Sequence, residues 1–119
     1  MRLSLGVEVD IKGLTDKYLV MKKAIEITDK LAYNMKGEGV EEVKLLTLDK
    51  IVKIETGTDA PIFKWNYLSG IQCDLRVTIY NVNTQFSLFM EAEKIRFEDI
   101  QKRFNEMKLV AEIFRDKFG

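Results

Sequence analysis

Two carboxylates and a lysine near the N-terminus have a spacing that could do chemistry. Glu8, Asp10 and Lys12 lie two residues apart, so in an extended strand their side chains share one face. Two carboxylates beside a lysine resemble half of a metal-dependent nuclease site, in which Mg²⁺ takes oxygen ligands and activates a water. A third carboxylate would come from a neighbouring strand, and Asp74 is the candidate. The alternative is a solvated strand face with charges of both signs.

An aromatic segment follows the single proline of the chain. Residues 62–68 contain the only tryptophan, Trp65, together with Phe63 and Tyr67. Tryptophan and tyrosine dominate binding hot spots, so an exposed segment of this kind would suit a ligand or a partner protein. The same residues alternate as they would in one more strand, with one face closing the core. We predict a binding site made by these side chains: Phe63, Lys64, Trp65, Tyr67, Arg76 and Tyr80.

The charges of the chain balance and are dispersed. Lysine plus arginine and aspartate plus glutamate each total 19, so the formal net charge is zero and no overall field attracts a polyanion. Arg76, Thr78 and Tyr80 on the wet face of a strand would offer bases a stacking platform. Asp74 shares that row, however, and the composition therefore disfavours nucleic-acid binding as an alternative function.

Two features of the composition limit the kinds of catalytic and metal sites that the chain can form. The chain has no histidine, which removes Ser/His and Cys/His triads and zinc sites that need imidazole. Its one cysteine, Cys73, cannot form an internal disulfide, and it falls in an apolar row where a thiol usually acts as an inert hydrophobe. We expect no cofactor and no metal, and we favour a non-catalytic protein over a metal-dependent hydrolase.

Length and hydropathy predict one domain, residues 1–119. Hydrophobic residues make up 46% of the chain and charged residues 32%, which is typical of a globular protein. No apolar run approaches the length of a membrane span. Charge interrupts the N-terminal apolar residues too early for a signal peptide, and a lone free cysteine is typical of a reducing compartment. We therefore expect a cytoplasmic protein with no membrane partner.

Two periodicities predict the elements that position these residues. Apolar and polar residues alternate over 3–11, 71–79 and 86–90, which predicts strands, the last two in an antiparallel hairpin. Apolar residues three and four apart predict helices over 18–35 and 97–118.

The order of these elements predicts an α+β fold. It consists of a mostly antiparallel sheet of four to five strands with two long amphipathic helices on one face, in the order β-α-β(β)-β-β-α. Segment 40–55 is ambiguous, because its adjacent apolar pairs suit a strand or a short helix, although its β-branched residues favour a strand.

The last helix carries a long apolar stripe. Its residues recur at spacings of three and four: Phe97, Ile100, Phe104, Met107, Ala111, Phe114 and Phe118. Leu109, Val110 and Ile113 widen the stripe beyond a coiled-coil seam, which favours packing on the chain's own sheet. We predict that this flank contacts a second copy. The sequence thus predicts a homo-oligomeric binding module for an unidentified protein or small molecule, with the aromatic segment as its contact surface.

Overall fold

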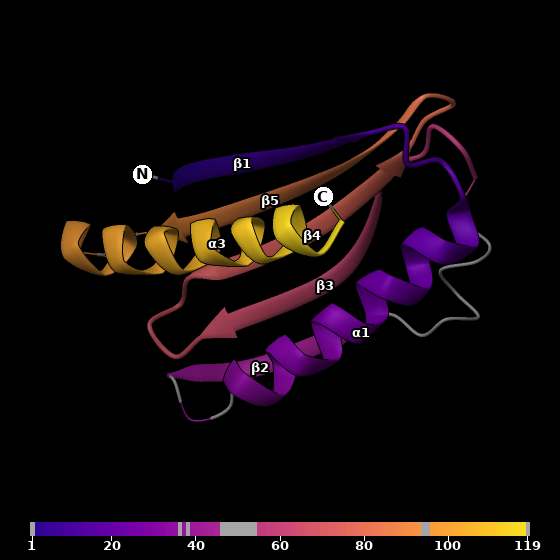
Figure 1. The fold of residues 1–119 in the computed structure, drawn as a ribbon. Coiled ribbons are helices and arrows are strands. Elements are labelled where there is room, and N and C mark those ends of the chain that lie inside the picture. Colours follow the sequence, from indigo (N-terminus) through magenta and orange to yellow (C-terminus); the bar gives the residue numbers. More distant parts are fainter. Residues whose placement is uncertain (1, 36, 38, 46–54, 94–95, 119) are drawn as a thin grey trace.

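The computed structural model describes residues 2–35, 37, 39–45, 55–93 and 96–118. Within these residues five strands form one antiparallel sheet, and two helices lie against it (Figure 1). The elements in chain order are β1 (Arg2–Lys12), α1 (Lys17–Met35), β2 (Val40–Leu45), β3 (Ala60–Tyr67), β4 (Gln72–Ile79), β5 (Asn83–Glu93) and α3 (Phe97–Phe118). The predicted α+β class is confirmed, with the order β-α-β-β-β-β-α.

The sheet has the strand order β1-β5-β4-β3-β2, so the first two strands of the chain lie at opposite edges. β4 and β5 form the predicted antiparallel hairpin. β1 pairs with β5 along its full length, from Arg2 opposite Glu93 to Lys12 opposite Asn83. In the ambiguous segment, Val40–Leu45 is a strand, and residues 46–54 lie outside the described residues.

Local signals in the sequence set the ends of both helices. Asp16 precedes α1, and its Oδ1 accepts a hydrogen bond of 3.2 Å from the backbone N–H of Leu19, as an N-cap does. Gly37 and Gly39 follow α1 with φ of 85° and 79°, a conformation that suits glycine. In α3 the first turn is acidic and the last is basic, which complements the helix dipole. Neither helix of the described chain is both long enough and apolar enough to cross a bilayer.

The buried faces of both helices and one face of the sheet form a single core. The predicted stripe of α3 is confirmed from Met107 to Phe114, and the Phe114 ring packs on Phe86 of β5 with centroids 4.9 Å apart. The prediction was wrong at Phe97, whose side chain is 73% exposed. Phe97 lies in the first turn of α3, which projects past the ends of β1 and β5 in Figure 1 and has no sheet beneath it.

The two helices lie on the same face of the sheet, one near each edge. α3 packs on β1 and β5, α1 packs against β2, and the helices run antiparallel with little backbone contact between them (Figure 1). Strands lie about 4.8 Å apart, so helices centred over the two edge pairs of a flat five-stranded sheet would be roughly 14 Å apart. Directly packed helices lie about 8–10 Å apart. The space between the helices, over β4, is therefore either filled by long side chains or left open.

Truncation of Phe114 tests where the core lies. The Phe114→Ala variant should lower the free energy of unfolding by about 3–5 kcal/mol, because it leaves a cavity against Phe86. The control, Phe97→Ala in the same helix, should change it by less than about 0.5 kcal/mol. Urea unfolding followed by Trp65 fluorescence measures both variants. Equal losses would contradict this placement of the core.

Candidate functional site

The aromatic segment forms β3, and its alternation divides the predicted binding residues between the two faces of the sheet. Phe63, Trp65 and Tyr67 lie on the inner face, and Trp65 is 1% exposed. Lys64 and Arg76 lie on the outer face, with Tyr80 exposed in the turn after β4. The structure therefore does not bring these six side chains together on one surface. A binding role for them stays a prediction, while the three aromatic side chains of β3 have a clear packing role.

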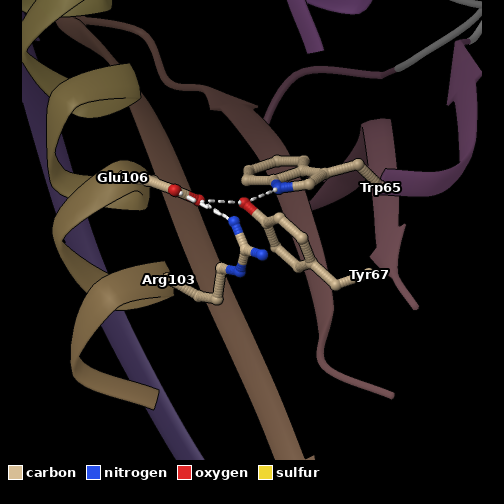
Figure 2. Close-up of polar contacts among 4 residues, drawn as sticks. All are labelled: Trp65, Tyr67, Arg103 and Glu106. Atoms are coloured by element: carbon tan, nitrogen blue, oxygen red, sulfur yellow. Dashed lines mark hydrogen bonds and ion pairs between the residues drawn. The ribbon is translucent and has the colours of Figure 1, made fainter. Parts of the chain in front are cut away.

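Trp65 and Tyr67 connect the sheet to α3 through a hydrogen-bonded chain (Figure 2). The indole N–H of Trp65 donates to the Tyr67 hydroxyl at 3.0 Å, and that hydroxyl donates to Glu106 Oε2 at 2.7 Å. Arg103, one turn before Glu106, donates to both carboxylate oxygens at 3.0 and 3.1 Å. The Arg103 guanidinium also lies 4.1 Å from the centroid of the Tyr67 ring. These four residues, the Tyr67 network, span the distance between β3 and α3.

The Tyr67 network suits a structural role better than proton transfer. Burial, and then the hydrogen bond to Glu106, raises the pKa of Tyr67 well above its usual value of 10.0, so the hydroxyl stays protonated. Gly39 leaves room for Arg103, since a Cβ at that position would lie 3.0 Å from the guanidinium. The network therefore connects α3 to β3, and the guanidinium of Arg103 lies close to the turn after α1.

Cys73 lies on the same inner face, opposite Trp65 in the register of β3 and β4. Its thiol is buried, as predicted. Burial, followed by the nearby charge of Glu106, raises the pKa of Cys73 from 9.0 to about 12. A thiol that stays protonated at neutral pH is a poor nucleophile, so Cys73 is a packing residue.

An open groove lies between α1 and the C-terminal half of α3. Its main part has a volume of about 450 Å³. Ile27 and Leu31 of α1 and Ile113 of α3 supply its apolar surface, while Ile27 and Leu31 also belong to the core. A second hollow of about 370 Å³ continues along α1 toward its N-terminus and is lined by Leu14, Leu19 and Phe118 among others. Both hollows have Lys23 and Glu26 in their lining, so they are neighbours along α1, and together they are called the interhelical groove.

Lysines surround this apolar surface. Lys22, Lys23 and Lys30 come from α1 and Lys117 from the last turn of α3. The Nζ atom of Lys23 lies 5.2 Å from the centroid of the Phe118 ring, at the junction of the two hollows. Glu26 is the carboxylate among the lining residues. The groove thus combines an apolar floor with a mainly cationic rim.

Sequence reasoning did not find the interhelical groove, although it named one of its residues. Ile113 was predicted, with Leu109 and Val110, as a flank that contacts a second copy. Leu109 and Ile113 are exposed, Val110 is buried, and Ile113 faces the groove. Contact with a second copy stays a prediction. Lys23 and Lys30 are seven residues apart and so share a helix face, but only the tertiary structure places Lys117 opposite them.

The outer face of the sheet does not bring together the three carboxylates of the alternative, a metal-dependent hydrolase site. Glu8 and Asp10 lie on the outer face of β1, but Asp74 lies beside Phe89, which in turn lies beside Gly6. At strand spacings of about 4.8 Å and about 3.3 Å per residue, Asp74 and Asp10 are roughly 16 Å apart. Within the described ranges, no group of three His, Cys, Asp or Glu side chains could hold a metal ion.

A polar hollow of about 300 Å³ also lies on the outer face, but its main cation is already paired. Arg76 donates to Asp74 at 3.0 Å and to Asp59 at 3.2 Å. The hydrogen bond to Asp74 is the main cause of a raised Arg76 pKa. Two carboxylates on one guanidinium leave little positive potential for a phosphate, which makes this face a weak candidate for binding nucleic acid.

Comparisons with known proteins do not assign the chain to a family. No model of a known family matches it, and no curated protein matches it in sequence. Among solved structures it is similar to the crystal structure of Ara h 8.0201, with a TM-score of 0.47 and 7% sequence identity over 97% of each chain. A likeness of this size assigns neither a family nor a ligand.

Removal of one hydroxyl tests the Tyr67 network. Tyr67→Phe should lower the free energy of unfolding by about 1–3 kcal/mol, because Trp65 Nε1 and Glu106 lose their shared partner in a buried setting. Tyr80→Phe is the matched control, since Tyr80 is 41% exposed and should tolerate the change within about 0.5 kcal/mol. Urea unfolding compares the two variants, and an equal effect would show that the network contributes nothing to stability.

Proposed function

We propose that this protein is a small binding domain that takes an apolar ligand into the interhelical groove. The observation that carries the proposal is an apolar surface left open between two helices of one domain. Its main part, about 450 Å³, is within the range of about 300–1,000 Å³ that ligand sites occupy. Its floor consists of side chains that also belong to the core, so the shape of the site is set by the fold itself.

The energetics support a ligand with an extended apolar portion. Each CH₂ group fully removed from water contributes about 0.8 kcal/mol, so a chain of about ten methylenes contributes up to about 8 kcal/mol before the cost of association. The second hollow, beside Leu19 and Phe118, lengthens the available surface. A ligand in the main part of the groove displaces water from Ile113, which is 37% exposed in the free protein. An elongated ligand fits this shape better than a compact one.

The chemistry of the described residues supports binding rather than catalysis. The chain contains no histidine. The buried hydroxyl of Tyr67 and the buried thiol of Cys73 both have raised pKa values, so neither supplies a nucleophile at neutral pH. The groove itself is lined by aliphatic side chains, Phe118, lysines, Glu26 and Asn34, which suit recognition of a ligand.

A polar substitution on the groove wall tests this proposal. Ile113→Asn should weaken binding of a neutral solvatochromic dye, Nile red, about tenfold, because it removes roughly 1.4 kcal/mol of apolar contact. Leu109→Asn is the matched control, since Leu109 lies one turn earlier on α3, is 59% exposed and does not line the groove. Fluorescence titration measures both dissociation constants. Absence of dye binding, or equal weakening by the two substitutions, would contradict the proposal.

A further inference from the structure

We infer that the ligand of the interhelical groove is a single-chain anionic amphiphile, such as a long-chain carboxylate. This inference rests on the proposed function and adds the class of ligand. Its apolar chain would lie along Ile27, Leu31 and Ile113, and its anionic head group would be held at the lysine rim. Three observations support it: the sign of the rim charges, the absence of ion pairs between these lysines and the carboxylates of the described residues, and the position of the lysines beside an apolar floor.

The rim carries an excess of positive charge. The two hollows are lined by four lysines, Lys22, Lys23, Lys30 and Lys117, and by one carboxylate, Glu26. This local excess contrasts with a chain whose formal net charge is zero. In a partly enclosed groove with apolar walls, charges of one sign raise the local concentration of the opposite ion. The rim therefore favours a negatively charged head group.

These lysines are not used within the described part of the chain to neutralise carboxylates. The ion pairs there involve other residues, and none includes Lys22, Lys23, Lys30 or Lys117. On the outer face, by contrast, Arg76 is held by two carboxylates. An anion that enters the groove thus gains an ion pair without breaking one. An anion that binds Arg76 would have to compete with Asp59 and Asp74.

The position of Lys23 suggests how chain and head group are accommodated together. Its Nζ atom lies over the Phe118 ring at the junction of the two hollows. A lysine has a long flexible stem, so the ammonium can leave the aromatic ring and pair with an anion while its methylenes still cover the apolar surface. Movement of this one side chain would join the two hollows along the same helix.

Displacement of Nile red by two ligands of equal chain length, decanoate and decan-1-ol, tests the charge of the head group. Decanoate should displace the dye from the wild-type protein at a concentration several-fold lower than decan-1-ol, and the difference should shrink as salt is raised. Equal displacement by the two ligands would overturn the inference while leaving the proposed function intact. Failure of the dye itself to bind would overturn the proposed function.

Substitution of the rim lysines by methionine locates the anion. A variant with Lys23→Met, Lys30→Met and Lys117→Met should weaken decanoate binding about tenfold, with about twofold to threefold from each single change, and should not weaken dye binding, because methionine keeps the apolar surface. The control is Lys102→Met, on the exposed side of α3 away from the groove, for which decanoate binding should stay within twofold. An equal loss from Lys102→Met and from each single rim change would overturn the inference.

A membrane surface is the other source of anionic amphiphile, and vesicles distinguish it. Sedimentation with phosphatidylglycerol vesicles should leave the protein in the supernatant under conditions in which monomeric decanoate binds. Association with vesicles without binding of decanoate would overturn the inference, since it would make the lysines a membrane-docking surface.

Discussion

The width of a five-stranded sheet is the constraint on which the rest of the structure depends. α3 packs on β1 and β5 at one edge, and α1 packs against β2 at the other. Two helices in direct contact cannot cover both edges of a sheet this wide, because helices pack about 8–10 Å apart. The central strands must therefore be covered by long side chains, or the space between the helices must stay open. The protein uses both solutions, at different places along α3.

Near the start of α3, large and polar side chains fill the space. Trp65 and Tyr67 extend from β3, and Arg103 and Glu106 extend from the helix to meet them (Figure 2). Buried polar groups are costly unless they are paired, and each of these groups has a partner of suitable geometry. The network thus accounts for the aromatic composition of β3 without requiring that Trp65 contact a partner protein.

Toward the end of α3, the space stays open. Ile113 is about ten residues beyond Arg103, or roughly 15 Å along the helix axis, and faces α1 across the interhelical groove. The flank of the helical stripe therefore forms, within one molecule, one wall of the groove in which we propose that a ligand binds. The same exposed apolar surface is what a predicted contact with a second copy would cover, so ligand and second copy would compete for Ile113.

Most of the fold could be predicted from local sequence patterns, but the candidate site, the interhelical groove, could not. Alternation in β1 and β4 and the stripe of α3 are strong signals, because they repeat over many residues. The stripe misled at Phe97, where periodicity continues past the end of the sheet. The sequence of residues 62–68 could not show whether Trp65 is buried. A strand with one buried face and an exposed aromatic segment can both have aromatic residues at every second position. In the sequence, Lys23, Lys30 and Lys117 cannot be distinguished from ordinary solvent-exposed lysines. Only the antiparallel arrangement of the two helices places them around one groove.

A titration of isotope-labelled protein with decanoate, followed by amide chemical shifts, tests the central claim most directly. The account predicts shifts concentrated at residues 19–34 of α1 and 113–118 of α3, with the outer face of the sheet around Arg76 and Phe89 unchanged. Shifts centred on the outer face, or spread evenly over the molecule, would contradict the claim that the space left by the wide sheet is the binding site.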